Sequence, residues 1–260
     1  MSTRADTWSA SQYRLFEDER NRPIADLLAA LPPFAAPNAI DLGCGPGNSS
    51  ELLLARYPGA RLSGIDRSPD MIAAARKRLP AVAFEIGEVE SWSAPGPYEV
   101  ILANAVLHWL PDHERLFPSL AARLPRGGAL AVQMPDNLEE PTHRLMREVA
   151  ARLHPQIARQ ADATRTTLGT AADYYRWLRA SCRRVDVWRT TYHHPLAGGV
   201  RGIVEWFKGS ALGPYLTPLD ASARASFLEA YAEALAPHYA PLADGSVLLP
   251  FPRLFIVAVR

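Results

Sequence analysis

The segment Ala39–Ser50, AIDLGCGPGNSS, carries the strongest chemical signal in the chain. An apolar run ends at Asp41, and glycines then alternate at Gly43, Gly45 and Gly47 before a helix-start pattern. This order predicts a strand, a sharp turn and a helix N-terminus, where a ligand can approach the backbone closely. The dinucleotide fingerprint G-x-G-x-x-G fails because its sixth position is asparagine. An acid placed before the glycines instead favours a cationic ligand.

Two further acids follow at the ends of predicted strands. Asp66 ends the alternating segment RLSGID about twenty residues after the glycine turn, where a carboxylate can accept both hydroxyls of a ribose. Glu88 follows a short strand that ends near Ile86, and it could accept a proton of an adenine amino group. Two of the acids have a simpler alternative, which is a turn cap for Asp41 and a helix start for Asp66. Glu88 has a second acid, Glu90, close to it near the same strand end. Together the three acids indicate a nucleoside site without choosing between NAD and S-adenosylmethionine.

The full set of motifs resembles a known family. DLGCGPGNSS, GIDRSPDMI, the acid at Glu88, ANAVLHWLPD and LPRGGALAVQMPDN follow the order and spacing of class I S-adenosylmethionine-dependent methyltransferases. The resemblance implies an α/β, Rossmann-like fold with a mostly parallel seven-stranded sheet and a helical cap. It implies S-adenosylmethionine as cofactor and S-adenosylhomocysteine as product. The cofactor-binding residues that it implies are Asp41, Gly43, Gly45, Asp66, Arg67, Met71, Glu88, Val89 and Asn104.

Segments outside these motifs narrow the resemblance. YRLFEDERNRP, VQMPDN, WRTTYHH and FPRLFIVAVR are similar to segments of the family members that methylate trans-aconitate. This likeness implies in-line methyl transfer to a carboxylate, which gives the monomethyl ester without a metal. Two alternatives stay open: a different small carboxylate, such as a malonyl thioester on an acyl carrier protein, and a cofactor-binding partner protein without catalysis. The near-neutral charge disfavours the first alternative, and the intact loop ANAVLHW disfavours the second.

His108 lies in that loop, which flanks the transferred methyl group in this family. A carboxylate substrate is ionised at pH 7, because its reference pKa is near 4, so it needs no base to become a nucleophile. The enzyme must instead desolvate the carboxylate and orient one of its oxygens, which can supply roughly 7–11 kcal/mol. We therefore interpret His108 as the catalytic residue that positions the substrate. Packing beneath the cap is the alternative.

The carboxylates that do not react need cationic or hydrogen-bonding partners, since an unpaired buried charge is unstable. Only two of the 28 basic residues are lysines, and arginine binds carboxylates in a bidentate manner. The substrate-binding candidates come from the segments that make the likeness specific: Tyr13, Arg144, Arg147, Arg189, Tyr192 and Arg253. A solvated surface position is the alternative for each arginine, and packing between helices is the alternative for Tyr13. The neighbours His193 and His194 would point to opposite faces of a strand, so they predict no metal site.

Composition predicts a cytoplasmic protein of one domain. The formal net charge of +1 over 260 residues implies no attraction to nucleic acid or to an anionic membrane. Two cysteines are too few for a disulfide framework, and the polar first twenty residues do not resemble a signal peptide. Protein partners stay undefined.

Alternating strand and helix patterns predict right-handed βαβ units. Strands are expected near 38–42, 61–65, 82–86, 98–103, 129–134, 184–193 and 253–259. Helices are expected as two short segments within 8–31 divided at Pro23, at 141–153, at 173–181 and over 198–240 with breaks at Pro214 and Pro218. The single domain would cover 1–260, with cap elements from 1–34, 136–172 and 198–245. The ligand site should lie at the carboxyl ends of the strands.

Overall fold

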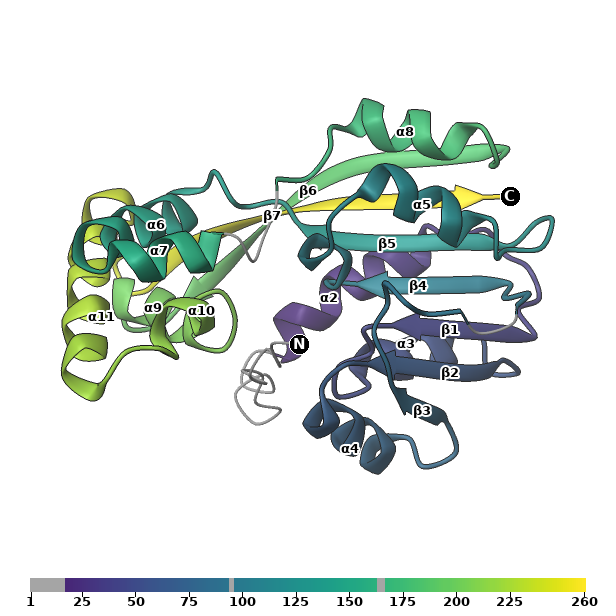
Figure 1. The fold of residues 1–260 in the computed structure, drawn as a ribbon, viewed down its shortest axis with the longest axis horizontal. Coiled ribbons are helices and arrows are strands. Elements are labelled where there is room, and N and C mark those ends of the chain that lie inside the picture. The colour runs from purple at the N-terminus through teal and green to yellow at the C-terminus, as the bar shows by residue number, and fades with distance from the viewer. Residues whose placement is uncertain (1–16, 94–95, 163–166) are drawn as a thin grey trace. The chain divides into compact units, whose positions relative to one another are not determined.

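The computed structural model describes residues 17–93, 96–162 and 167–260. Seven strands form one sheet in the order β3-β2-β1-β4-β5-β7-β6 (Figure 1). Their bounds are β1 (Asn38–Leu42), β2 (Arg61–Asp66), β3 (Ala83–Ile86), β4 (Val100–Asn104), β5 (Ala129–Pro135), β6 (Arg184–Leu196) and β7 (Val247–Val259). Strands β1 to β5 pair in parallel, and β7 pairs antiparallel with β5. The predicted α/β fold with a mostly parallel seven-stranded sheet is confirmed.

The described residues divide into two compact units. The sheet unit contains the chain from Glu17 to Pro135, together with 168–190 and 253–260. The helical unit contains 136–162, residue 167 and 191–252. The long strands β6 and β7 each contribute residues to both units.

In the sheet unit, alternate side chains of the central strands face opposite sides of the sheet. Ile40, Ile101 and Leu130 belong to the main core cluster, which also contains side chains of α5 (His113–Ala121) and α8 (Ala171–Arg179). The opposite face is contacted by α2 (Glu17–Ala29) and by α3 (Asn48–Arg56). Helix α4 (Pro69–Arg78) covers β2 and β3. Both faces of the parallel part are therefore covered, as parallel sheets require.

The predicted division of the N-terminal helices at Pro23 is wrong. Helix α2 runs without interruption through this proline. A proline inside a helix costs about 3 kcal/mol, because it lacks the N–H donor and clashes with the preceding turn. Burial of Ile24, Leu27 and Leu28, which lie on the same face as Pro23, offsets that cost. The part of the prediction that covers residues 8–16 lies outside the described residues.

The helical unit contains the other described helices. These are α6 (Pro141–Leu153), α7 (Pro155–Asp162), α9 (Val200–Lys208), α10 (Gly213–Leu216) and α11 (Ala221–Leu235), with a short 3-10 turn, η2 (Ala236–His238). Helix α11 packs on α6 and α9, and α7 packs on α6 and α10. The helix predicted at 141–153 is confirmed, whereas α7 falls in a stretch for which no helix was predicted. None of the described helices is long and apolar enough to cross a membrane.

Candidate functional site

The glycine turn after β1 has the left-handed backbone that its sequence predicts. Gly43, Gly45 and Gly47 have φ values of +67°, +54° and +90°. A Cβ atom on Gly43 would lie 2.4 Å from a methyl carbon of Val106, in the loop after β4, so no side chain fits there. A Cβ atom on Gly45 would meet no atom of the described residues within 4 Å. The backbone at Gly45 is therefore open to the close approach of a ligand.

Asp66 ties this turn to the end of β2. Its carboxylate accepts hydrogen bonds from the backbone N–H groups of Gly45 and Ser68, both at 2.9 Å. The backbone carbonyl of Asp66 accepts from the N–H of Gly87 at 3.0 Å, which brings the end of β3 alongside. The three strand ends that carry the predicted nucleoside motifs are therefore joined through one residue.

Asp41 is fully buried at the end of β1. One carboxylate oxygen, Oδ2, accepts hydrogen bonds from the hydroxyls of Ser49 and Ser50 at 2.6 and 2.7 Å. The other oxygen, Oδ1, has no hydrogen-bond partner among the described residues. Burial raises the pKa of Asp41 to about 7, with a smaller contribution from the negative charge of Asp66. A positively charged ligand would stabilise the ionised carboxylate.

Asn104 lies on the same face of the sheet as Asp41. Asp41 is in register with Leu102, and Asn104 follows two residues later on the same strand. Asn104 is buried at the end of β4, and its Oδ1 has no hydrogen-bond partner among the described residues. Two buried acceptor oxygens on adjacent strands thus suit a ligand that carries N–H donors and positive charge.

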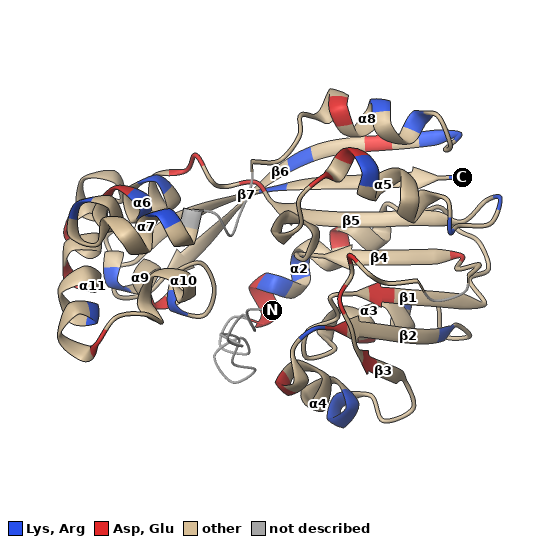
Figure 2. Ribbon diagram, viewed as in Figure 1, with Lys and Arg blue, Asp and Glu red and all other residues tan. Residues whose placement is uncertain are grey.

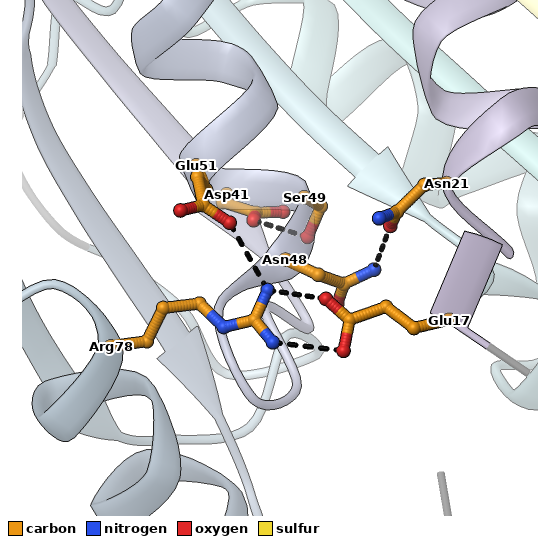
Figure 3. A network of polar contacts seen from close by, with 7 residues as sticks. All are labelled: Glu17, Asn21, Asp41, Asn48, Ser49, Glu51 and Arg78. Atoms are coloured by element: carbon orange, nitrogen blue, oxygen red, sulfur yellow. Dashed lines mark hydrogen bonds and ion pairs between the residues drawn. The ribbon is translucent and has the colours of Figure 1, made fainter. Parts of the chain in front are cut away.

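A polar network holds the first turn of α3 against α2 and α4 (Figure 3). The guanidinium of Arg78, on α4, binds both carboxylate oxygens of Glu17 at 2.6 and 2.9 Å and reaches Glu51 at 3.1 Å. The amide of Asn48 donates to Asn21 of α2 at 2.7 Å. These contacts fix the helix that begins directly after the glycine turn.

The other predicted cofactor residues lie close to these motifs in sequence. Arg67 and Glu88 have exposed side chains, while Met71 and Val89 are buried. Met71 lies in the first turn of α4, where its backbone N–H donates to the hydroxyl of Ser68 at 3.4 Å. Val89 packs in the main core cluster. Their contacts with a ligand stay predictions.

His108 lies in η1 (Leu107–Trp109), a 3-10 turn directly after β4. It is buried, and its ring lies 4.7 Å from the ring of Trp109. The turn is held by His113, whose Nε2–H donates to the backbone carbonyl of Leu107 at 2.9 Å. The hydroxyl of Tyr174, on α8, donates a hydrogen bond to Nδ1 of His113 at 2.7 Å. Burial lowers the pKa of His113, which keeps this imidazole neutral at pH 7.

Neither His113 nor Tyr174 was identified from the sequence. The two residues are 61 positions apart, and nothing in the local pattern around either of them signals the contact. With one ring nitrogen donating and the other accepting, the imidazole is a fixed brace for the backbone beside His108.

The predicted substrate residues fall into both units. Arg144 and Arg147, on α6, pair with acids of the same region: Arg144 with Glu148 at 2.9 Å and Arg147 with Glu139 at 3.6 Å. Figure 2 shows basic and acidic segments interspersed along this part of the chain. Tyr192 is buried in the helical unit.

The two remaining arginines belong to the sheet unit. Arg189 is exposed on β6, whereas Arg253 is buried on β7 and donates a hydrogen bond to the side-chain oxygen of Gln133. Tyr13 lies outside the described residues. Among the predicted substrate residues that the structure describes, Arg253 is therefore the one that is both buried and held beside the strand ends of the sheet unit.

Comparison with known proteins identifies the family of this chain. A family model described as a methyltransferase domain matches residues 16–181, so the chain belongs to the methyltransferase family. Solved structures with the same fold include the YcgJ protein of Bacillus subtilis, with a TM-score of 0.57 at 14% identity over 92% of this chain and 98% of that chain. A second is phosphoethanolamine N-methyltransferase 2 of Haemonchus contortus in complex with S-adenosyl-L-methionine, with a TM-score of 0.56 at 15% identity over 92% of this chain and 52% of that chain.

More similar relatives share one particular name. Trans-aconitate 2-methyltransferase of Methylobacterium nodulans is 58% identical over 256 residues, which cover 97% of this chain and 98% of that protein. Trans-aconitate 2-methyltransferase of Rhizobium meliloti is 52% identical over 256 residues, which cover 98% and 99%. The similarity therefore extends through the helical unit as well as the sheet unit.

Proposed function

We propose that this protein transfers the methyl group of S-adenosylmethionine to a carboxylate of trans-aconitate, giving S-adenosylhomocysteine and the monomethyl ester. The observation that carries the proposal is 58% identity across 97% of the chain to a trans-aconitate 2-methyltransferase. The matched region covers nearly the whole chain, so it extends well beyond the cofactor motifs that many methyltransferases share.

The sheet unit fits the cofactor. S-adenosylmethionine carries an ammonium group and a positively charged sulfur, and it supplies a methyl group that a carboxylate oxygen can take directly. The buried oxygens Asp41 Oδ1 and Asn104 Oδ1 are the acceptors that this positive charge requires. Asp66, at the end of β2, is assigned to the ribose hydroxyls, and Glu88 to the adenine amino group.

The chain's own contribution to catalysis is orientation. A carboxylate is already ionised at pH 7, so no side chain has to remove a proton from it. His108 is assigned to hold the substrate by hydrogen bonding, in a turn whose backbone is braced by His113. Arg253 is assigned to a carboxylate of the substrate, and the other substrate residues proposed are Tyr13, Arg144, Arg147, Arg189 and Tyr192.

The activity is tested by transfer of a radiolabelled methyl group from S-adenosylmethionine. Trans-aconitate is compared with cis-aconitate, isocitrate, citrate and a malonyl thioester. The proposal requires that trans-aconitate has the highest kcat/KM. A preference for the malonyl thioester would establish the alternative substrate, and absence of transfer to every acid would leave only a cofactor-binding protein.

A variant tests the role of His108. His108→Asn should raise KM at least as much as it lowers kcat, because it removes a positioning contact. Loss of an obligatory base would instead lower kcat by roughly 10²–10⁴-fold, with recovery at higher pH. His238→Asn, at an exposed position in η2, is the matched control and should leave both constants unchanged.

A further inference from the structure

The carboxyl ends of β4 and β5 present a polar cluster on one face of the sheet. Asn104 on β4 is in register with Gln133 on β5. Arg253 approaches from the antiparallel strand β7, and its Nη1 donates a hydrogen bond to Oε1 of Gln133. The exposed fractions of the three side chains are 8%, 0% and 5%. Polar groups buried to this extent normally have hydrogen-bond partners.

The orientation of the Gln133 amide is fixed by its neighbour. A guanidinium has N–H donors and no acceptor, so the amide oxygen must face Arg253 and the amide nitrogen must face away. That nitrogen, Nε2, is buried and has no hydrogen-bond partner among the described residues. A donor left unused in this way is unfavourable, and an acceptor atom of a ligand would satisfy it.

The polarity of this face changes from strand to strand. Asp41 on β1 and Asn104 on β4 offer unused acceptor oxygens, whereas Gln133 on β5 offers an unused donor beside the positive charge of Arg253. Adjacent strands are about 4.8 Å apart, and Asn104 is in register with Gln133, so the unused acceptors and the unused donor lie on neighbouring strands of one face. A cation suits the β1–β4 side, and an anion suits the β5–β7 side.

We propose that Gln133 and Arg253 together bind a carboxylate of the substrate that is not methylated, with Gln133 as a determinant of substrate specificity. This inference rests on the proposed function. The Nε2 donor of Gln133 and the guanidinium of Arg253 form the donor set that a carboxylate prefers. A carboxylate held by a guanidinium is a weaker nucleophile, because its oxygen lone pairs are already engaged. The reacting carboxylate must therefore be a different one on the same molecule.

A purely structural role for Gln133 makes the opposite prediction. If Gln133 serves only as a hydrogen-bond partner of the buried Arg253, its side-chain oxygen is the only atom that this role needs. Gln133→Glu keeps such an oxygen, so it should keep or strengthen the contact with Arg253. If Gln133 helps to bind a carboxylate of the substrate, Gln133→Glu instead removes the Nε2 donor and places a negative charge beside the bound anion. The variant therefore separates the two roles, while the similar size of the two side chains limits the change in packing.

The experiment measures three quantities for Gln133→Glu and for Gln133→Met. KM for trans-aconitate should rise by roughly 30-fold or more in the first variant and by roughly tenfold in the second, following the loss expected when a buried charge pair is broken. The dissociation constant of S-adenosylhomocysteine should stay close to that of the parent protein in both variants. The Tm should also stay close in Gln133→Glu, whereas it should fall in Gln133→Met, which removes a hydrogen-bond partner of the buried Arg253. Gln156→Glu, at an exposed position on α7, makes the same change of charge and should leave KM unchanged.

Analogues of the substrate identify the carboxylate that is bound. Itaconate, mesaconate and glutaconate each lack a different carboxylate of trans-aconitate. The parent protein should discriminate strongly against one of them for lack of the bound carboxylate, and Gln133→Glu should reduce that discrimination. Unchanged KM and unchanged discrimination would overturn the inference. Weakened S-adenosylhomocysteine binding with unchanged KM would also overturn it, because the donors would then serve the cofactor.

Failure of the proposed function gives a different result. If the parent protein methylates another acid of the screen and not trans-aconitate, the same variants are measured with that acid. If no acid reacts, calorimetry measures trans-aconitate binding to the complex with S-adenosylhomocysteine. Binding that Gln133→Glu weakens would support the carboxylate site without the activity, and absence of binding to the parent protein would overturn it.

Discussion

Cofactor affinity should depend on pH through Asp41. The pKa of this buried carboxyl is about 7, so about half of the side chains are ionised at pH 7 and only about 3% at pH 5.5. A cationic ligand binds to the ionised form. Affinity for S-adenosylhomocysteine, whose ammonium group stays charged over this range, should therefore fall by about 15-fold between pH 7 and pH 5.5, equivalent to about 1.6 kcal/mol.

The mechanism also predicts release of a proton. Binding at pH 7 converts a half-ionised Asp41 to the ionised form, so about half a proton should be released for each ligand bound, and more at pH 6. Calorimetric titration in two buffers with different enthalpies of ionisation measures this number directly. The same titrations, repeated from pH 5.5 to 7, give the change of affinity.

Asp41→Asn provides the decisive comparison. The variant should bind S-adenosylhomocysteine about tenfold or more weakly at pH 7, since it loses a charged acceptor. It should also lose most of the pH dependence and of the proton release. It retains every histidine, so a contribution of those side chains would persist in it. Equal slopes of affinity against pH in the two proteins would refute the reasoning. Glu233→Gln, at an exposed position on α11, should behave like the parent protein.

Three further predictions concern the supports of the site. Gly43→Ala should lower the free energy of unfolding by at least about 2 kcal/mol in denaturant titrations, because φ is +67° and the new Cβ would lie 2.4 Å from Val106; Gly59→Ala, which meets nothing within 4 Å, should not. Burial lowers the pKa of His113, so a proton binds the unfolded chain more readily, and stability should fall as the pH decreases below about 6.5. His113→Asn should reduce that dependence, and an unchanged pH profile would contradict it. Arg78→Met should weaken S-adenosylhomocysteine binding a few-fold and lower stability by about 1 kcal/mol, since partly exposed ion pairs contribute little; no change in affinity would show that this network does not support the glycine turn.

Local patterns were sufficient to predict the parallel part of the sheet and the glycine turn. The alternating apolar residues of β1 and β2, and the glycines between them, encode their structure within a few residues of chain. The extents of β6 and β7 were underestimated. Pro195, Pro250 and Pro252 interrupt the pattern there, and prolines usually mark the end of a strand or an edge.

Contacts between distant positions could not be predicted in the same way. Gln133 and Arg253 are 120 positions apart, and their hydrogen bond exists only because β7 returns antiparallel beside β5. Arg253 was selected for its charge, but its partner has no charge and lies in a strand of otherwise apolar side chains. By contrast, the ion pair of Arg144 with Glu148 follows from the i, i+4 spacing of a helix, so the sequence itself predicts a partner for this arginine.

The path of the chain between the two units has a consequence for protein engineering. The described part of the helical unit is assembled from separate stretches of sequence, with boundaries at Pro135–Asp136, Thr167–Leu168, Thr190–Thr191 and Pro252–Arg253. It can therefore not be exchanged with a relative's counterpart as one continuous cassette. A working chimera must replace the interrupted stretches together, joined at these boundaries. Gln133 and Arg253 would stay with the recipient sheet, so such chimeras would test whether substrate preference follows the sheet unit or the exchanged stretches.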